Sequence, residues 1–192
     1  MTLLEHPRIY RLSQKLNPMT SALYRQLVFE HVAATTSGAI LDIGCGVGAH
    51  RSLFTTQDYV GIDVNADYIT AASQIYGDRF LVMDAGAMDF PSDRFDAVFS
   101  VATCHHLDDT RVLSMVREGM RILRSGGMMH VVDAVLPVSR SRFKRALFAH
   151  DRGRFQRTIF EITALLSSQA RVSCVDVRSG VLHDVCYVRL VR

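Results

Sequence analysis

Three glycines and two carboxylates in the first third of the chain have the spacing of a nucleotide-binding site. Residues 41–48 read Leu-Asp-Ile-Gly-Cys-Gly-Val-Gly, so the glycines come directly after a short apolar run. Glycine allows the backbone to turn sharply and to approach a ligand closely. Asp63 follows Gly44 by nineteen residues, at the end of the next apolar run, where a carboxylate can accept both hydroxyls of a ribose. The combination predicts a site for a nucleotide ligand.

Two classes of ligand fit this glycine loop. The series Gly44-x-Gly46-x-x-Ala49 satisfies the dinucleotide fingerprint, so NAD is one candidate. Asp42 lies just before the loop, where it would repel a pyrophosphate and attract the ammonium of a methionine moiety. We expect residues 47–55 to form a helix whose free N–H groups and positive dipole end face the ligand. An NAD-dependent oxidoreductase and a non-catalytic nucleotide-binding domain both remain open on these residues.

Two adjacent histidines, His105 and His106, follow the fourth apolar run, and Asp133 ends the fifth. Histidine is the usual general base near neutral pH, and a carboxylate can orient a histidine or bind a substrate amine. Because adjacent side chains rarely point the same way, we expect one histidine to face the ligand. Cys104 precedes the pair, but three consecutive residues cannot easily close on one ion, so we expect no metal.

The elements that would position these residues alternate between strand and helix. Five apolar runs have strand character: 39–43, 59–63, 79–84, 95–101 and 128–133. Helical spacing is found at 47–55, 66–76, 109–123 and 158–168. The alternation predicts a parallel sheet covered on both faces, with ligands beyond the carboxyl ends of its strands. Two further runs, 171–178 and 185–191, are expected to pair as an antiparallel hairpin.

Length and composition indicate a single cytoplasmic domain. The 192 residues are divided into a helical cap (1–36), a cofactor-binding core (37–136), a basic lid insertion (137–157) and a last helix with the hairpin (158–192). The longest stretches without a charged residue are 11 residues, whereas a membrane-spanning helix needs about 20 apolar residues. The N-terminus does not have the pattern of a signal peptide, and the four cysteines show no paired spacing.

Charge is distributed unevenly along the chain. Residues 1–136 carry 11 basic and 15 acidic groups, whereas residues 137–192 carry 11 basic and 4 acidic groups. Residues 138–157 alone hold seven basic side chains against Asp151. Three interpretations stay open for this segment: a solvated lid helix, a site for an anionic substrate, or a contact with an anionic membrane or nucleic acid, of which we rank nucleic acid low.

These motifs together resemble the class I S-adenosylmethionine-dependent methyltransferases of the small-molecule type, with domains of the methyltransferase 11 and 25 kind. The resemblance is carried by 41–48, 61–64, 83–85, 95–100 and 122–127, where Ser125 replaces the usual proline. It implies a Rossmann-like doubly wound α/β fold of seven mostly parallel strands, in which the last strand inserts antiparallel. The residues that it implies for binding S-adenosylmethionine are Asp42, Gly44, Cys45, Gly46, Gly48, Asp63, Val64, Asp84, Ala85 and Val101.

The resemblance also implies a reaction. A methyl group would pass by in-line displacement to a small or lipid-like metabolite, with oxygen as the expected acceptor atom and S-adenosylhomocysteine as the product. By position, His106 is favoured as the base, with His105 and Asp133 as the other catalytic candidates. No Asn/Asp-Pro-Pro-Tyr sequence follows the fourth strand, so amino groups of nucleic-acid bases are not the expected acceptors. The acceptor is expected to be a small molecule, and contact with a membrane surface through 138–157 stays open.

Overall fold

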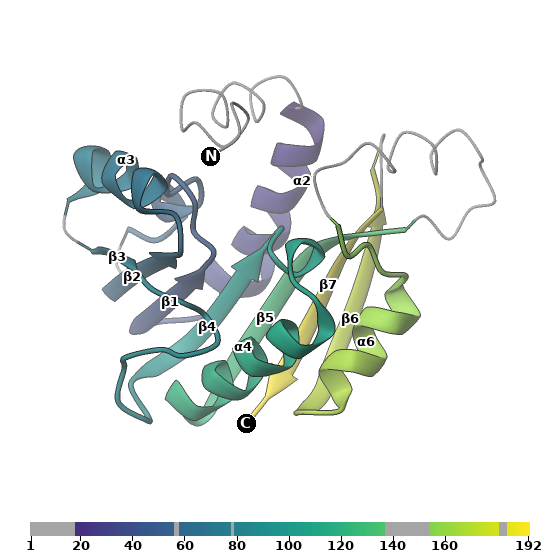
Figure 1. The fold of residues 1–192 in the computed structure, drawn as a ribbon. Coiled ribbons are helices and arrows are strands. Elements are labelled where there is room, and N and C mark those ends of the chain that lie inside the picture. The colour runs from purple at the N-terminus through teal and green to yellow at the C-terminus, as the bar shows by residue number, and fades with distance from the viewer. Residues whose placement is uncertain (1–17, 56–57, 78, 137–153, 181–183) are drawn as a thin grey trace.

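A seven-stranded sheet forms the centre of the computed structural model, which describes residues 18–55, 58–77, 79–136, 154–180 and 184–192. The strand order across the sheet is β3-β2-β1-β4-β5-β7-β6 (Figure 1). The strands are β1 (Ala39–Ile43), β2 (Asp58–Asp63), β3 (Phe80–Val82), β4 (Phe95–Val101), β5 (Leu123–Val135), β6 (Arg171–Ser179) and β7 (Asp184–Val191). The α-helices are α2 (Pro18–Val28), α3 (Ala66–Tyr76), α4 (Asp109–Ile122) and α6 (Ile159–Ser167).

The direction of the strands divides the sheet into two parts. β1 to β5 pair with one another in parallel, whereas β7 runs antiparallel to both of its neighbours, β5 and β6. The seven-stranded, mostly parallel sheet with an antiparallel C-terminal hairpin was predicted from the sequence and is confirmed. β7 does more than close a hairpin, because it inserts between β5 and β6 and joins β6 to the rest of the sheet.

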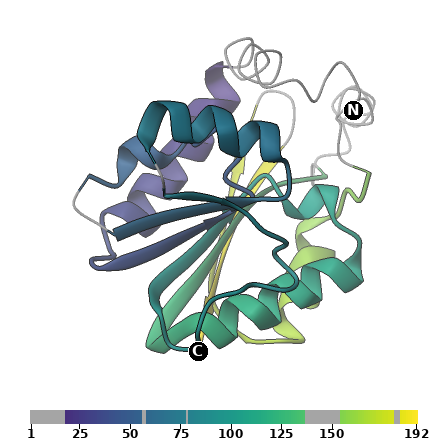
Figure 2. The same ribbon diagram turned by 60° about the vertical axis from the view of Figure 1, so that its left-hand side comes forward.

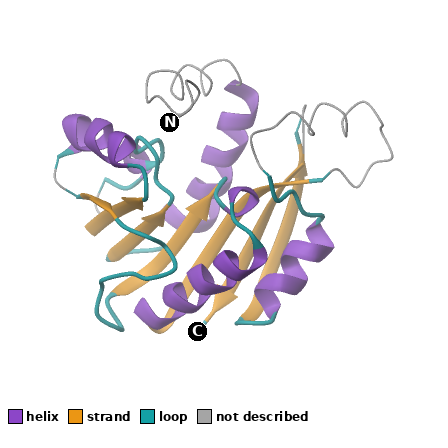
Figure 3. Ribbon diagram, viewed as in Figure 1, coloured by secondary structure: helices purple, strands orange, loops and turns teal. Residues whose placement is uncertain are grey.

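Helices cover both faces of the sheet, so each face has its own core. Figure 2 shows α2 and α3 on one side of the strands and α4 and α6 on the other, and Figure 3 shows the same layers by element type. Successive residues of a strand point to opposite faces. Ile40 of β1 therefore packs in the core beneath α2, and Leu41 packs in the core beneath α4.

Side-chain caps fix where three of these helices begin. Asn65 accepts hydrogen bonds from the N–H groups of Asp67 and Tyr68 ahead of α3, and Asp108 accepts one from Arg111 ahead of α4. Thr158 and Glu161 form a capping box at the start of α6. Such caps satisfy backbone donors that the first turn of a helix leaves unpaired. At α3 and α4 the caps end short strand-to-helix loops, at the edge of the sheet where the predicted site residues lie.

One predicted helix is wrong. Residues 47–55 form turns and a single 3-10 turn over Arg51–Leu53, instead of an α-helix. Gly48 has a φ of +77°, which a right-handed helix cannot contain, so no helix can start at the glycine loop itself. Phe54 is fully buried and its backbone (φ −115°, ψ 79°) is no longer helical, so the segment ends within six residues of Gly48. The expected helix N-terminus behind the loop is therefore absent from the described residues.

Two strands differ from their predicted limits by more than one residue. β3 ends at Val82 and not at residue 84, because the Asp84 side chain closes a turn with the N–H of Gly86. β5 begins at Leu123 and not at residue 128, because Leu123 already pairs with Phe95 across a register shift. The first helical piece predicted within 1–36 lies in residues 1–17, and most of the basic segment 138–157 also lies outside the described residues. None of the described helices is long and apolar enough to cross a membrane.

Candidate functional site at the carboxyl ends of the strands

The glycine loop after β1 is bonded to the tip of β2. The N–H groups of Gly44 and Cys45 both donate to the carbonyl of Ile62, at 2.8 and 3.0 Å. The N–H of Gly46 donates to the Asp63 carboxylate at 3.0 Å. The loop and the carboxylate that the sequence predicted to act on one ligand are thus held together by the fold.

Asp63 is a partly buried carboxylate at the end of β2. Its two oxygens accept from the N–H groups of Gly46 and Asn65. Burial raises the pKa of Asp63, and the N–H groups of Asn65, Gly46 and Val64 oppose that rise. A carboxylate has about four lone-pair positions, so these bonds leave acceptor capacity for ribose hydroxyls. Val64, beside it, is 69% exposed and offers an apolar surface at the same tip.

Asp42 is a buried carboxyl group with one unsatisfied oxygen. Its side chain is 1% exposed, and Oδ2 accepts a hydrogen bond from the Tyr59 hydroxyl at 2.7 Å. Oδ1 has no hydrogen-bond partner among the described residues. Burial raises the pKa of Asp42 to about 8; the Tyr59 hydroxyl opposes the shift, and the charge of Asp63 adds to it. A buried carboxyl with an unpaired oxygen is a place where a positively charged group gains most by binding.

The remaining predicted cofactor residues differ in what they can offer. The Cys45 side chain is 4% exposed and lies against Gly61, so only its backbone can meet a ligand. Asp84 is exposed and has one oxygen in the turn to Gly86, and Ala85 packs against the core. Val101 is 7% exposed at the end of β4.

The end of β4 brings a second loop over the first. Ala102 has a φ of +53°, which is uncommon for a residue other than glycine, and its N–H donates to the carbonyl of Val132. This bend carries the Thr103 side chain over Gly44, whose φ is +71°. A Cβ at position 44 would overlap with Thr103 Oγ1. Gly44 therefore serves both the turn of its own loop and the close approach of the next one.

A histidine and an aspartate form a buried pair beyond this bend. His105 Nδ1 donates to Asp133 Oδ1, and the two side chains are among the least exposed polar groups of the chain. Asp133 also accepts from the N–H groups of Cys104, at 2.6 Å, and Ala134, at 2.7 Å. Burial acts to raise the pKa of Asp133, but His105 and these N–H groups outweigh it and hold the pKa below its usual value. Asp133 is therefore an ionised carboxylate that orients His105.

The structure distinguishes the two adjacent histidines. His106 is exposed, and its ring lies 4.1 Å from that of His105, centroid to centroid. Of the two histidines, His105 is the one with a described hydrogen bond to Asp133, although the sequence favoured His106 by position. The 3-10 turn over Cys104–His106 explains the difference, since it directs successive side chains about 120° apart.

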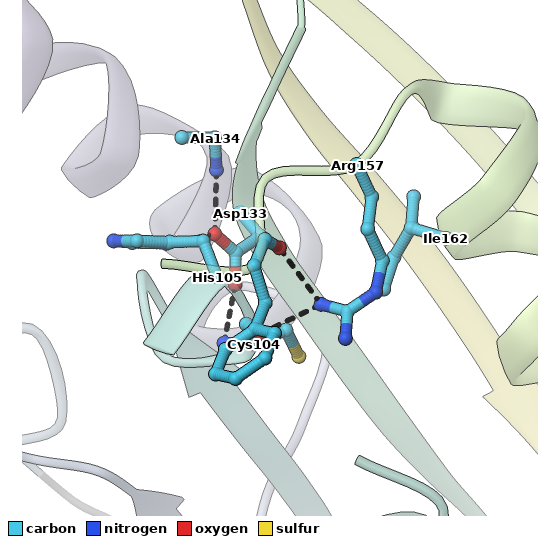
Figure 4. A pocket seen from close by; sticks show the side chains of 7 residues that line it. Cys104, His105, Asp133, Ala134, Arg157 and Ile162 are labelled. Carbon is cyan, nitrogen blue, oxygen red and sulfur yellow. Dashed lines mark hydrogen bonds and ion pairs between the residues drawn. The ribbon is translucent and has the colours of Figure 1, made fainter. Parts of the chain in front are cut away.

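A small cavity lies next to this pair. It is lined by Cys104, His105, Asp133, Ala134, Phe155, Arg157 and Ile162 (Figure 4). Phe155 is 40% exposed, and its N–H donates to the His105 carbonyl at 3.0 Å. Sequence reasoning did not single out Thr103 or Phe155, and it placed Arg157 in a basic segment without a role of its own. The capping box at Thr158, just after Arg157, was a signal that the end of this segment is fixed.

Residues 41–131 match the family model described as methyltransferase domain. A fatty-acid O-methyltransferase of Mycolicibacterium smegmatis is 31% identical over 142 residues, which are 70% of this chain and 50% of that protein. A 2-methyl-6-phytyl-1,4-hydroquinone methyltransferase of Synechocystis is 32% identical over 102 residues, which are 49% of this chain and 31% of that protein. The chain thus spans half or less of the length of these two relatives.

Solved structures share the fold at low sequence identity. The YcgJ protein of Bacillus subtilis superposes with a TM-score of 0.70 at 18% identity, over 89% of this chain and 99% of that one. The [4+2]-cyclase SpnF superposes with a TM-score of 0.65 at 21% identity, over 82% of this chain and 60% of that one. The same architecture therefore carries more than one activity, and the reaction has to be argued from the site.

Proposed function

Residues 41–131 match a methyltransferase domain, and on that premise we propose that the chain transfers a methyl group from S-adenosylmethionine to an oxygen atom of a small or lipid-like metabolite. The observation that carries the proposal is the contact of Thr103 with Gly44. It brings the glycine loop and the loop of the buried His105–Asp133 pair together at one end of the sheet. A cofactor site and a proton acceptor lie side by side, as transfer to a hydroxyl requires.

The residues present fit S-adenosylmethionine. In this proposal Asp63 accepts from the ribose hydroxyls, Asp42 binds the ammonium group, and the glycine loop allows close approach of the backbone. Bound at this place, the cofactor supplies a methyl group that is already electrophilic. NAD fits less well, because its pyrophosphate is normally held at a helix N-terminus and residues 47–55 provide none. A pyrophosphate would also favour the neutral form of Asp42, so this carboxyl group adds nothing to the binding of NAD, whereas an ammonium group favours its ionised form.

In this proposal His105 is the general base. Donation from Nδ1 to Asp133 sets the tautomer in which Nε2 carries the lone pair. Nε2 accepts the proton of an acceptor hydroxyl as the new bond to carbon forms, and Asp133 stabilises the resulting imidazolium. A positioned base contributes typically about 10²–10⁴-fold to the rate.

The lipid-like character of the acceptor is supported by two observations. The relatives named above are described as acting on a fatty acid and on a phytyl hydroquinone, which are both largely apolar. Phe155 leaves 40% of its surface exposed beside His105, where it can cover an apolar group. We therefore place first among candidate acceptors those with a hydroxyl attached to an apolar body.

The first test is calorimetric titration with S-adenosylmethionine, S-adenosylhomocysteine and NAD. Saturable binding of the first two without NAD is the expected result. An acceptor screen would follow, with apolar phenols, alcohols and fatty acids as separate groups. Binding of NAD alone would overturn the assignment of the cofactor, and transfer only to amines would overturn the assignment to oxygen.

A further inference from the structure

The guanidinium group of Arg157 makes five hydrogen bonds to other groups of the protein. Arg157 lies just before α6 and is only 9% exposed. Nε donates to Asp109 Oδ1 at 2.9 Å, and one terminal nitrogen donates to the same oxygen at 2.7 Å and to the Leu107 carbonyl at 2.8 Å. The other donates to the carbonyls of Cys104 and Phe155, at 2.9 and 3.1 Å. These five hydrogen bonds match the five donors of an arginine.

Most of these acceptors belong to the loop that carries His105. Cys104 and Leu107 lie on either side of the two histidines, and Asp109 opens α4 directly after them. The segment around Arg157 makes two further backbone bonds here, from Phe155 N–H to the His105 carbonyl and from Leu136 N–H to the Arg157 carbonyl. Figure 4 shows the guanidinium group of Arg157 bonded to backbone carbonyls next to the His105–Asp133 pair. Arg157 thus joins the histidine loop, the end of β5 and the start of α6.

We propose that Arg157 is the positioning residue that keeps His105 in hydrogen-bonding contact with Asp133. The inference rests on the proposed function for its catalytic meaning, but its structural content is independent of it. The loop over residues 102–108 bends at Ala102, which has a positive φ. One 3-10 turn is the regular structure in this loop, so the loop needs contacts from elsewhere to fix it. The planar guanidinium supplies three carbonyl bonds and a paired bond to a carboxylate in one rigid group. An ammonium group cannot reproduce that fork.

This role accounts for one of the basic residues whose purpose the sequence left open. All five donors of Arg157 have protein acceptors, so the guanidinium is not available to a substrate anion or a membrane phosphate in this arrangement. Its charge is balanced by Asp109, whose side chain is 70% exposed. The acceptor site beside His105 therefore gains no net positive charge from Arg157, which suits an uncharged hydroxyl acceptor.

The test compares Arg157→Lys with Arg121→Lys. Arg121 is a matched control, since its guanidinium also binds two carbonyls, those of Met88 and Phe90, and one carboxylate, Glu118, but holds a different loop. The first readout is the downfield proton NMR signal of His105 Nδ1–H, which is assigned by its loss in His105→Gln. It requires neither cofactor nor acceptor. We expect this signal in the wild type and in Arg121→Lys, and its loss through faster exchange in Arg157→Lys.

The second readout separates positioning from general damage. Arg157→Lys is expected to bind S-adenosylmethionine within about twofold of the wild type and to lose about 10- to 100-fold in kcat, a fraction of what a base contributes. Asp109→Asn, on a side chain that is 70% exposed, should give a smaller loss of the same kind. Should Arg157→Lys fail to fold, the Asp109→Asn signal decides in its place.

Two results would overturn the inference. One is an Nδ1–H signal of His105 that is as sharp in Arg157→Lys as in Arg121→Lys. If Arg157→Lys does not fold, the same comparison is made between Asp109→Asn and Arg121→Lys. The other is an equal loss of kcat in the Arg157 and Arg121 variants. A protein that binds no S-adenosylmethionine but loses the signal only in Arg157→Lys would refute the proposed function and leave the positioning role standing.

Discussion

The two halves of the site are built in different ways. The cofactor half, formed by the glycine loop and Asp63, is held by backbone N–H groups over a short stretch of sequence. The acceptor half, formed by residues 102–109 and 154–158, is held by side chains that cross the chain, such as Arg157 to the carbonyl of Cys104. The first half depends on its glycines and on one side chain, the carboxylate of Asp63. The second depends on a few polar side chains that have to meet correctly.

The largest effect that this comparison predicts is at the histidines. His105→Ala should lower kcat by about 10²–10⁴-fold with unchanged affinity for S-adenosylmethionine, since it removes the group that Asp133 orients. His106→Ala, one residue away and exposed, should stay within about threefold of the wild type. Steady-state kinetics with a saturating acceptor measures both variants. The reverse ranking would return the role of base to His106.

The second prediction concerns the cofactor half. Asp63→Ala should weaken binding of S-adenosylmethionine by about 1.5–3 kcal/mol, the scale of hydrogen bonds to a charged group. The loss has two sources, because Asp63 also holds the N–H of Gly46. Calorimetry gives the affinity, and kcat at saturating cofactor should change little. If kcat fell and the affinity did not, the two halves would not be separable in the way described.

The third prediction uses the pH dependence of cofactor binding. Asp42 has a pKa of about 8 because it is buried, so the free protein holds it protonated below that pH. An ammonium group next to it favours the ionised form, and binding then has to expel a proton. Affinity should therefore fall as the pH falls below 8, by at most about tenfold per unit. Titrations in buffers of different ionisation enthalpy count the proton, and Asp42→Asn should remove the dependence.

The last prediction concerns the free energy of unfolding, at a residue that lies outside both halves of the site. His130 on β5 is fully buried beside the Tyr187 hydroxyl, and burial lowers its pKa to about 3, with Arg189 and His31 adding to the shift. In the unfolded chain the imidazole of His130 is protonated below about pH 6.5, whereas in the folded chain it stays neutral down to about pH 3. The contribution of His130 to the free energy of unfolding is therefore complete above pH 6.5 and is lost as the pH falls toward 3. Between pH 7.5 and 5 the loss should be about 2 kcal/mol.

Denaturant unfolding of the wild type and of His130→Gln at these two pH values measures that loss. The amide keeps an acceptor for Tyr187 and does not titrate, so the difference between the two proteins isolates His130. An equal pH dependence in both would show that other groups cause it. The same pair of proteins also tells whether a pH effect on activity comes from the site or from the fold.

The sequence predicted the cofactor half better than the acceptor half, for a physical reason. Alternating strand and helix patterns, glycines and the acid at the end of β2 are local signals, and each appears within a few neighbouring residues. The docking of Thr103 on Gly44, and of Arg157 on the histidine loop, depends on contacts between residues about 50 or more apart in the chain. No periodicity records such contacts. The adjacent histidines could not be told apart because a 3-10 turn, and not a helix, sets their directions.

The helix predicted over 47–55 is also wrong because of contacts between residues that are far apart in the chain. Its residues have ordinary helical composition, but Phe54 is drawn into the core beside Tyr59 and Phe99. Arg25 of α2 donates to the carbonyl of Ala49 at 2.9 Å, which fixes the segment from outside. Tertiary contacts of this kind override local propensity.

The insertion of β7 between β5 and β6 sets an order of events during synthesis. β6 leaves the ribosome before β7, yet its sheet hydrogen bonds are all to β7, so it waits without a partner strand. β5 likewise keeps one open edge until residues 184–191 arrive, and Asp133 on that strand is the residue that pairs with Cys186. Pairing over such a separation is slow and leaves strand edges exposed to other chains. The nascent chain can therefore assemble its glycine loop early, whereas β5, which carries Asp133, gains its second neighbouring strand only after β7 has been translated.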